Sequence, residues 1–300
     1  MIRRRPTLAV FALAGLLLSA CTVPAATPRP TAPSSAAVPF DPEAVLSASA
    51  EGIDAGGYAF SVTGPDFEMN GTVHPPSGSA DLLLVTNQRT VSVTTRERVI
   101  SGASYRQWSV SGGEWENNEE LLVLMERSPQ ASVREQAAVA RQMRKFLDGM
   151  LWTPPGTLPS PFTQQINPND PDVIGVKRLL GRVTTAQGDS LAITGTLDTS
   201  TLAKDKTVIG MLARSHPPRT GKAMPFQATL DAQNRIATLS LFVPGSPDTW
   251  VISLGEYGSG PVAMPPADSI KKPSATVLTY LRRNDFTKPP WYLRKPPPAE

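Results

Sequence analysis

The sequence is poor in the residues that metal sites, disulfides and acid–base catalysis use most. It contains one cysteine and two histidines in 300 residues. A single cysteine cannot form an intrachain disulfide, and one cysteine with two scattered histidines offers too few ligands for a zinc site. No phosphate-binding loop, dinucleotide fingerprint, HExxH motif or G-x-S-x-G elbow occurs. We therefore expect no cofactor and no metal, and a stability that rests on a buried apolar core.

The sequence also has no apolar run long enough to cross a bilayer as a helix. Three arginines at 3–5 precede the longest apolar stretch, 8–18, which has the length of a signal-peptide core. The motif Leu18-Ser19-Ala20-Cys21 follows and resembles a bacterial lipobox. The resemblance implies that the Cys21 sulfur carries a lipid and that cleavage makes Cys21 the N-terminus. The alternative is an ordinary signal peptide with an incidental cysteine.

A net charge is absent once this signal is set aside. The chain has 29 basic and 26 acidic residues, and three of the basic ones lie in residues 1–20, which contain no acid. Residues 21–300 therefore carry 26 of each. Without a basic excess we expect no nucleic-acid partner.

The composition divides the chain into four parts. Residues 1–20 form the signal peptide, and residues 21–40 form a tether rich in Pro, Ala, Thr and Ser, too poor in apolar residues to fold. Residues 41–267 are long enough for one domain. Residues 268–300 form a basic, proline-rich tail with Trp291 and Tyr292. The tail is predicted either to contact lipid headgroups or a protein partner, or to stay in solvent or pack on its own domain.

The domain shows mostly the two-residue period of β-strands. Alternating apolar residues predict ten strands separated by turn residues, near 58–62, 67–73, 81–86, 90–98, 105–110, 181–187, 190–197, 225–230, 236–243 and 250–257. Two helices are visible. Asp41-Pro42 begins a short one, and an apolar stripe from Val133 to Leu151 predicts a long one. The long helix is expected to start at Ser128-Pro129 or at the capping box Ser132-x-x-Glu135. Residues 153–175 are expected to be a loop.

The segment GDSL at 188–191 matches the name motif of a serine esterase family, with Ser190 in the place of the nucleophile. A nucleophilic serine needs a base, which that family supplies in an Asp-x-x-His motif. Neither His74 nor His216 lies in such a motif. We interpret residues 187–190 as a two-residue hairpin turn, because glycine accepts a positive φ. No spacing of acidic residues singles out a carboxylate pair, and we predict that the protein is not an enzyme.

Several stretches taken in order resemble one family. They are Gly57-Tyr-Ala-Phe-Ser-Val-Thr-Gly64, Gly71-Thr-Val73, Ser101-Gly-Ala-Ser-Tyr105 with Trp115, Gly195-Thr-Leu-Asp-Thr199, Met224-Pro-Phe-Gln-Ala-Thr-Leu-Asp231 and Tyr257-Gly258. Together with the lipobox they resemble actinobacterial lipoproteins of the LppX/LprG type, over about residues 42–265. The resemblance implies a LolA-like fold, an α+β curved antiparallel half-barrel with helices over its concave face. The loop at 153–180 and the tail from 268 fit that pattern poorly.

These inferences predict an extracytoplasmic lipoprotein, anchored to the cell membrane through Cys21, that binds a lipid or glycolipid. With only two visible helices, the apolar sheet face is expected to be incompletely covered and to leave a cavity for acyl chains. The predicted lining is Phe60, Val62, Leu82, Leu84, Val91, Val93, Ile193, Phe226, Leu241 and Ile252. One alternative is that side chains fill this face completely. Another is an interaction or stress-sensor module whose output is the binding of an envelope protein.

Overall fold

The computed structural model describes residues 40–112, 119–189, 191–216, 221–283, 285–287 and 290. The signal peptide, Cys21 and most of the tether therefore lie outside the described residues, as do Trp115, Ser190, Trp291 and Tyr292. Residues 40–300 form a unit separate from residues 1–39. All that follows concerns this unit.

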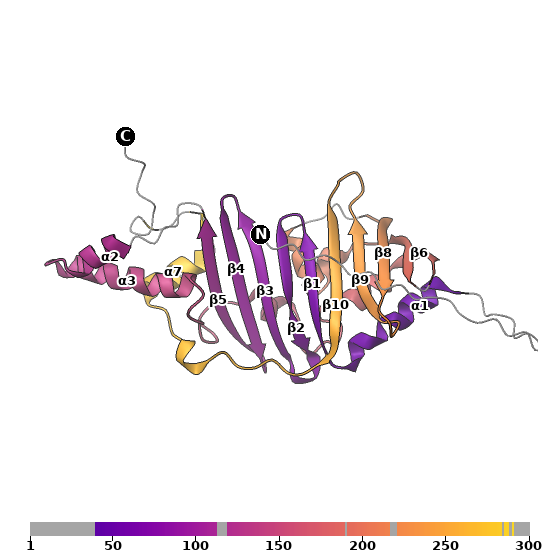
Figure 1. Ribbon diagram of the computed structural model, residues 1–300, viewed down its shortest axis with the longest axis horizontal. Helices are drawn as coiled ribbons and strands as arrows, with labels where there is room; N and C mark the ends of the chain where they lie inside the picture. The colour runs from indigo at the N-terminus through magenta and orange to yellow at the C-terminus, as the bar shows by residue number, and fades with distance from the viewer. Residues whose placement is uncertain are drawn as a thin grey trace, which may run out of the picture. The chain divides into compact units, whose positions relative to one another are not determined.

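The ten predicted strands are confirmed and form one antiparallel sheet, in an α+β architecture (Figure 1). Their order across the sheet is β5-β4-β3-β2-β1-β10-β9-β8-β7-β6. Two five-stranded meanders are thus joined where the first strand pairs with the last, and the sheet stays open at β5 and β6. The strands are β1 (Gly57–Gly64), β2 (Phe67–His74), β3 (Ser79–Gln88), β4 (Val91–Ile100), β5 (Ala103–Gly112), β6 (Val183–Gly188), β7 (Ala192–Leu197), β8 (Met224–Leu230), β9 (Ile236–Phe242) and β10 (Thr249–Ser259).

The alternation in the sequence gives the sheet one apolar face, which we call the inner face. Val62 is opposite Met69 on β2 and Ile252 on β10, and all three side chains are buried. The residues between them, such as Ser61 and Asn70, lie on the other, outer face. A one-residue shift in register would exchange the two faces, so the alternation fixes the register of the strands.

Seven α-helices are present in the described residues, which is more than the sequence pattern indicated. They are α1 (Pro42–Ser49), α2 (Glu119–Glu126), α3 (Ala131–Leu147), α4 (Pro161–Gln165), α5 (Val176–Leu180), α6 (Val208–Ser215) and α7 (Ala275–Arg283). Helices α2, α3 and α7 lie at the β5 side of the sheet, and α1 lies at the β6 side (Figure 1). The two predicted helices correspond to α1 and α3. The prediction that 153–175 is a loop missed α4.

The predicted start of α1 is confirmed, and that of α3 is not. Asp41 caps α1 as expected, since its carboxylate accepts from the backbone N–H groups of Glu43 and Ala44. The expected starts of α3 are wrong, because its N-cap is Gln130 and makes no side-chain capping bond. The guanidinium of Arg134 instead donates to the carbonyls of Ser128 and Pro129 and holds the preceding turn.

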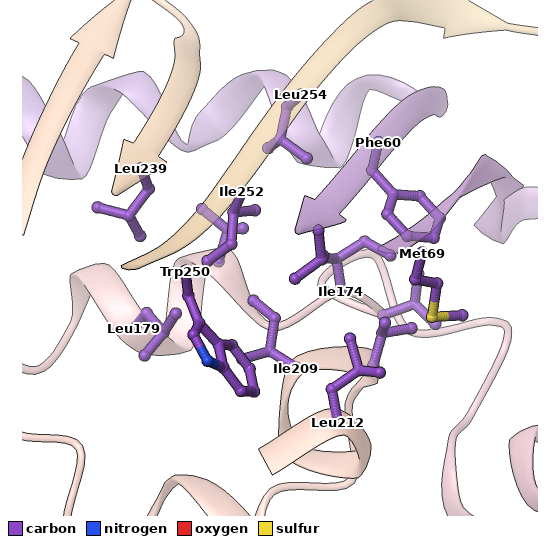
Figure 2. Packing of buried hydrophobic residues seen from close by; sticks show 14 of the residues in the cluster. Phe60, Met69, Ile174, Leu179, Ile209, Leu212, Leu239, Trp250, Ile252 and Leu254 are labelled. Atoms are coloured by element: carbon purple, nitrogen blue, oxygen red, sulfur yellow. The ribbon is translucent and has the colours of Figure 1, made fainter. Parts of the chain in front are cut away.

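Two separate groups of buried residues fill the inner face. The first, which we call the main core, joins β1–β4 and β7–β10 to α1, α4, α5 and α6. Figure 2 shows side chains of the sheet, such as Trp250 and Ile252, meeting Leu179 of α5 and Ile209 of α6. The second, the end core, consists of Val91, Val93, Trp108, Leu122, Met125, Ala137, Ala140, Met143, Phe146, Leu147, Val277, Tyr280, Leu281 and Phe286.

The end core moves the boundary of the folded domain toward the C-terminus. Val277 and Leu281 of α7 are buried in it, and so is Phe286. The sequence placed the end of the domain at residue 267, because the prolines after it indicated an extended tail. The first part of that tail, up to Phe286, packs with the domain instead.

The two edges of the sheet are covered by different means. At β5, the backbone of Thr153 pairs with that of Arg106, with N···O distances of 2.8 and 3.4 Å, and Trp152 in turn pairs with Ile270. At the other edge, α1 packs beside β6. Covering an edge leaves fewer unpaired backbone groups for another chain to bind.

Candidate functional site

All ten residues predicted to line a cavity lie on the inner face. The strand register places each of them on that side, from Val91 and Val93 on β4 to Ile193 on β7. Nine of the ten are at most 4% exposed, and only Leu84 is partly exposed. The alternation therefore identified the face of the sheet that is buried.

In the part of the chain that the structure describes, side chains fill most of the face over which the wide hollow was predicted. Phe60, Phe226, Leu241 and Ile252 pack in the main core, against helices that the sequence pattern did not reveal. Helices α5 and α6 are short, and α6 buries residues all round, including Gly210 and Ala213. Such helices span only about one or two turns, which is too short for a helical period to stand out in the sequence, and this explains why they were missed.

What remains open on the inner face is a slot between the two cores. It is lined by Met69, Leu82, Leu84, Thr95, Glu97, Arg106, Trp108, Phe162 and Met211, and its volume is about 110 Å³. Only Leu82 and Leu84 belong to the predicted lining. Phe162 comes from α4 and Met211 from α6, so the wall facing the sheet is built by the covering helices.

The inner-face residues of β4 explain why the slot lies there. In order they are Val91, Val93, Thr95, Glu97 and Val99. The first two belong to the end core and the last to the main core, and the two polar residues separate them. A threonine and a glutamate cannot join an apolar core without polar partners, so the two cores do not merge at this point.

The Glu97 carboxylate is buried in the lining of the slot, and both of its oxygens accept hydrogen bonds. Its Oε1 accepts from Ser104 Oγ at 2.7 Å and from Ser160 Oγ, and its Oε2 accepts from Arg106 Nη2 at 3.2 Å. The Glu97 and Arg106 side chains are only 7% and 14% exposed. A buried ion pair needs such additional hydrogen bonds to compensate its desolvation.

Arg106 connects this ion pair to the aromatic wall of the slot. Its Nη2 also donates to the carbonyl of Pro159 at 3.0 Å, and its Cζ lies 5.7 Å from the centre of the Trp108 ring. Ser160, which bonds Glu97, is the N-cap of α4, with Oγ accepting from the backbone N–H of Thr163. The ion pair therefore holds the start of α4, and with it Phe162, against the sheet.

Two larger hollows lie away from the boundary between the two cores. One of about 190 Å³ lies between α1, α5 and β6, and includes Leu46 and Leu180 in its lining. The other, of about 630 Å³, is a surface groove beside Phe40 and Arg235. Neither combines a buried aromatic wall with a buried charged pair. We regard the slot as the candidate functional site for this reason.

The GDSL segment forms part of the connection between β6 and β7. The Asp189 carboxylate accepts from the backbone N–H groups of Leu191 and Ala192, at 2.8 and 3.1 Å, and these bonds lower its pKa. Gly188 has a φ of 137°, as the hairpin prediction requires. The connection spans residues 189–191, however, so the predicted two-residue loop is one residue too short. Ser190 itself lies outside the described residues.

The two histidines occupy other elements. His74 Nδ1 lies 2.7 Å from Ser77 Oγ in the turn after β2. His216 follows α6 and its ring lies 4.7 Å from that of Phe67. Within the residues that the structure describes, no three His, Cys, Asp or Glu side chains come together as a metal site. No helix in the same residues is long and apolar enough to span a membrane.

Comparison with known proteins gives no relative. No protein-family model matches the chain, and no curated protein matches it significantly.

Sequence reasoning missed seven of the nine residues that line the slot. Glu97 and Thr95 could have been found, because they interrupt the apolar series on the inner face of β4. Trp108 and Arg106 follow from the register of β5 against β4 once that pairing is known. Phe162 and Met211 carry no local signal, since their helices are short and far away in the sequence.

Proposed function

We propose that this protein is an exported lipoprotein, anchored to the cell membrane through Cys21, that binds an acyl chain of a lipid in the slot between its two cores. The motif Leu18-Ser19-Ala20-Cys21 supports the anchor and an extracytoplasmic location. The ten-stranded sheet, with helices over its inner face, supports membership of the LolA-like half-barrels and resemblance to the LppX/LprG-type lipoproteins. No enzymatic step is part of this proposal.

The observation that carries the proposal is the chemistry of the slot walls. Six of its nine residues are apolar, and two of these are Met69 and Met211. Methionine side chains are flexible and fill irregular spaces, so they can yield to a ligand at low cost. Each buried methylene group of a ligand contributes about 0.8 kcal/mol, so a short length of chain already provides useful affinity.

The size of the slot limits what enters it without a rearrangement. Pockets for drug-sized ligands span about 300–1,000 Å³, and the slot has about 110 Å³. We therefore infer that it takes one segment of a single acyl chain, and that a longer segment requires movement of Met69 and Met211.

The proposal is tested with the full chain carrying Cys21→Ser, purified without detergent. The substitution removes the thiol proposed to be acylated, so that lipid found in an organic extract is ligand and not anchor. We expect acyl lipid at near-stoichiometric amounts by mass spectrometry. A clean extract, together with no binding of a fluorescent acyl ester, overturns the proposal.

A pair of substitutions on β3 assigns the binding to the slot. Leu84→Trp fills the slot, and Val85→Trp places the same side chain on the outer face. We expect Leu84→Trp to weaken binding of the fluorescent ester at least about tenfold. Val85→Trp should bind like the unsubstituted protein. Equal affinities of the two variants place the ligand elsewhere.

A second candidate function is a binding module for an envelope protein, without lipid carriage. The observation that favours it is the complete burial of nine of the ten predicted lining residues, which leaves little free volume. Its signature is a clean lipid extract together with a specific protein partner, recovered from membranes with the anchored protein.

A further inference from the structure

The charged residues at the slot influence which lipid headgroup the protein accepts. This inference rests on the proposed acyl-chain binding. Glu97 and Arg106 are the only two ionisable residues among the nine that line the slot. Their carboxylate and guanidinium are in direct contact, so the lining has no net charge. A lipid whose head lies beside this pair would contact both groups.

The hydrogen bonds of the pair are divided unequally between its two members. Both Glu97 oxygens are occupied, by two serine hydroxyls and by Arg106. Both bonds that the Arg106 guanidinium makes to described residues use Nη2. Nη1 and Nε of Arg106 therefore make no hydrogen bond to the described residues, whereas both Glu97 oxygens already accept at least one.

A free carboxylate and an ester carbonyl respond differently to this arrangement. Either one accepts a hydrogen bond from Arg106. The carboxylate, however, places a second negative charge beside Glu97 in a poorly solvated site, where like charges repel strongly. The ester carbonyl is neutral and avoids this repulsion.

We propose that Glu97 is a specificity-determining residue, which neutralises Arg106 so that the slot accepts the neutral acyl ester of a lipid and rejects the free fatty acid. This role accounts for a glutamate between the two cores. A leucine at this position would join the two cores and close the slot, whereas Glu97 keeps the slot open and neutralises Arg106.

The test compares dodecanoate with methyl dodecanoate at pH 7.5, each competing with a fluorescent acyl ester for the full chain carrying Cys21→Ser. A carboxylate costs more to desolvate than an ester in any apolar site. The decisive quantity is therefore the change in the ratio of the two affinities on substitution, and not the ratio in one protein.

We expect Glu97→Gln to tighten dodecanoate binding about tenfold and to leave methyl dodecanoate within about twofold, because the ligand carboxylate then pairs with Arg106. The matched control is Glu68→Gln, which removes the same charge from the outer face of β2 and should leave the ratio unchanged. An unchanged ratio in Glu97→Gln overturns the proposal, as does an equal change in Glu68→Gln.

Thermal unfolding provides a second readout, because Glu97→Gln leaves a guanidinium without its charged partner and lowers stability. Dodecanoate should raise the unfolding temperature of this variant more than it raises that of the protein with Glu97, whereas methyl dodecanoate should raise both by the same amount. An equal effect of dodecanoate on the two proteins overturns the role of Glu97. If neither ligand displaces the fluorescent ester from any protein, the acyl-binding function fails; if both do so without a ratio change, only the selectivity fails.

Discussion

The main core and the end core cover the same face of one sheet, but they are built differently. The main core is closed by three short helices, α4, α5 and α6, that all come from the second half of the chain. The end core is closed by the hairpin of α2 and α3 together with α7, which is over 120 residues further along the chain. Strand β4 contributes to both.

The difference shows how a continuous sheet can carry two packing units. Hydrogen bonding between strands continues across the boundary between the two cores, since β3, β4 and β5 are paired along their lengths. The side chains do not continue, because Thr95 and Glu97 interrupt the apolar face. A site between two independently covered regions can change in volume without unfolding either one, which is the property that a ligand slot requires.

The largest expected effects come from emptying each core. Phe226→Ala in the main core and Phe146→Ala in the end core each remove a buried ring, and we expect each to cost about 3–5 kcal/mol of unfolding free energy. Hydrogen exchange should separate them. Phe146→Ala is expected to speed exchange mainly in α2, α3 and α7, and Phe226→Ala throughout the sheet. Identical exchange patterns would mean that the cores form one cooperative unit.

Helix caps are expected to give an intermediate effect with opposite signs in the two regions. Thr207 is buried and caps α6, with Oγ1 accepting from the backbone N–H of Gly210 at 3.1 Å. Thr207→Ala should therefore cost about 1–2 kcal/mol. Gln130→Asp supplies the cap that α3 lacks and should add up to about 1 kcal/mol. Denaturant unfolding measures both. A loss of stability in Gln130→Asp would show that the turn held by Arg134 cannot accommodate a capping carboxylate.

The smallest expected effect is a pH dependence located at the main core. Burial lowers the pKa of His216, and the opposing effect of Asp66 is weaker. The unfolded chain therefore binds a proton more readily than the folded one, and stability should fall as the pH drops below about 6.5. His216→Gln should remove this part of the pH dependence in thermal unfolding curves, and His74→Gln should retain it. Equal curves for all three proteins would contradict the assignment.

The sequence was informative where the signal is periodic and local. Alternation identified all ten strands and placed all ten chosen apolar residues on the face that is buried. Asp41-Pro42 identified the start of α1. It was uninformative for α5 and α6, which are only one or two turns long. It was also uninformative for the segment after residue 267, where the prolines indicated an extended tail and the structure has a helix packed into the end core.

The candidate site was predictable in part. Leu82 and Leu84 were predicted correctly as residues of the inner face, and both line the slot. The polar pair was not predicted, because a glutamate and an arginine in a strand are usually found on the solvent side. Only their alternation with Val93 and Val99 places Glu97 inward, and only pairing with β5 brings Arg106 to it.

The sequence by itself determined the antiparallel strands and the face that they bury, because both depend on short periods along the chain. The tertiary structure decided how much of that face stays open. Burial depends on which distant segments of the chain cover the sheet, and α7 does so from about 160 residues beyond the end of β5. The small slot between the two cores, with Glu97 and Arg106 in its lining, is the outcome of that closure.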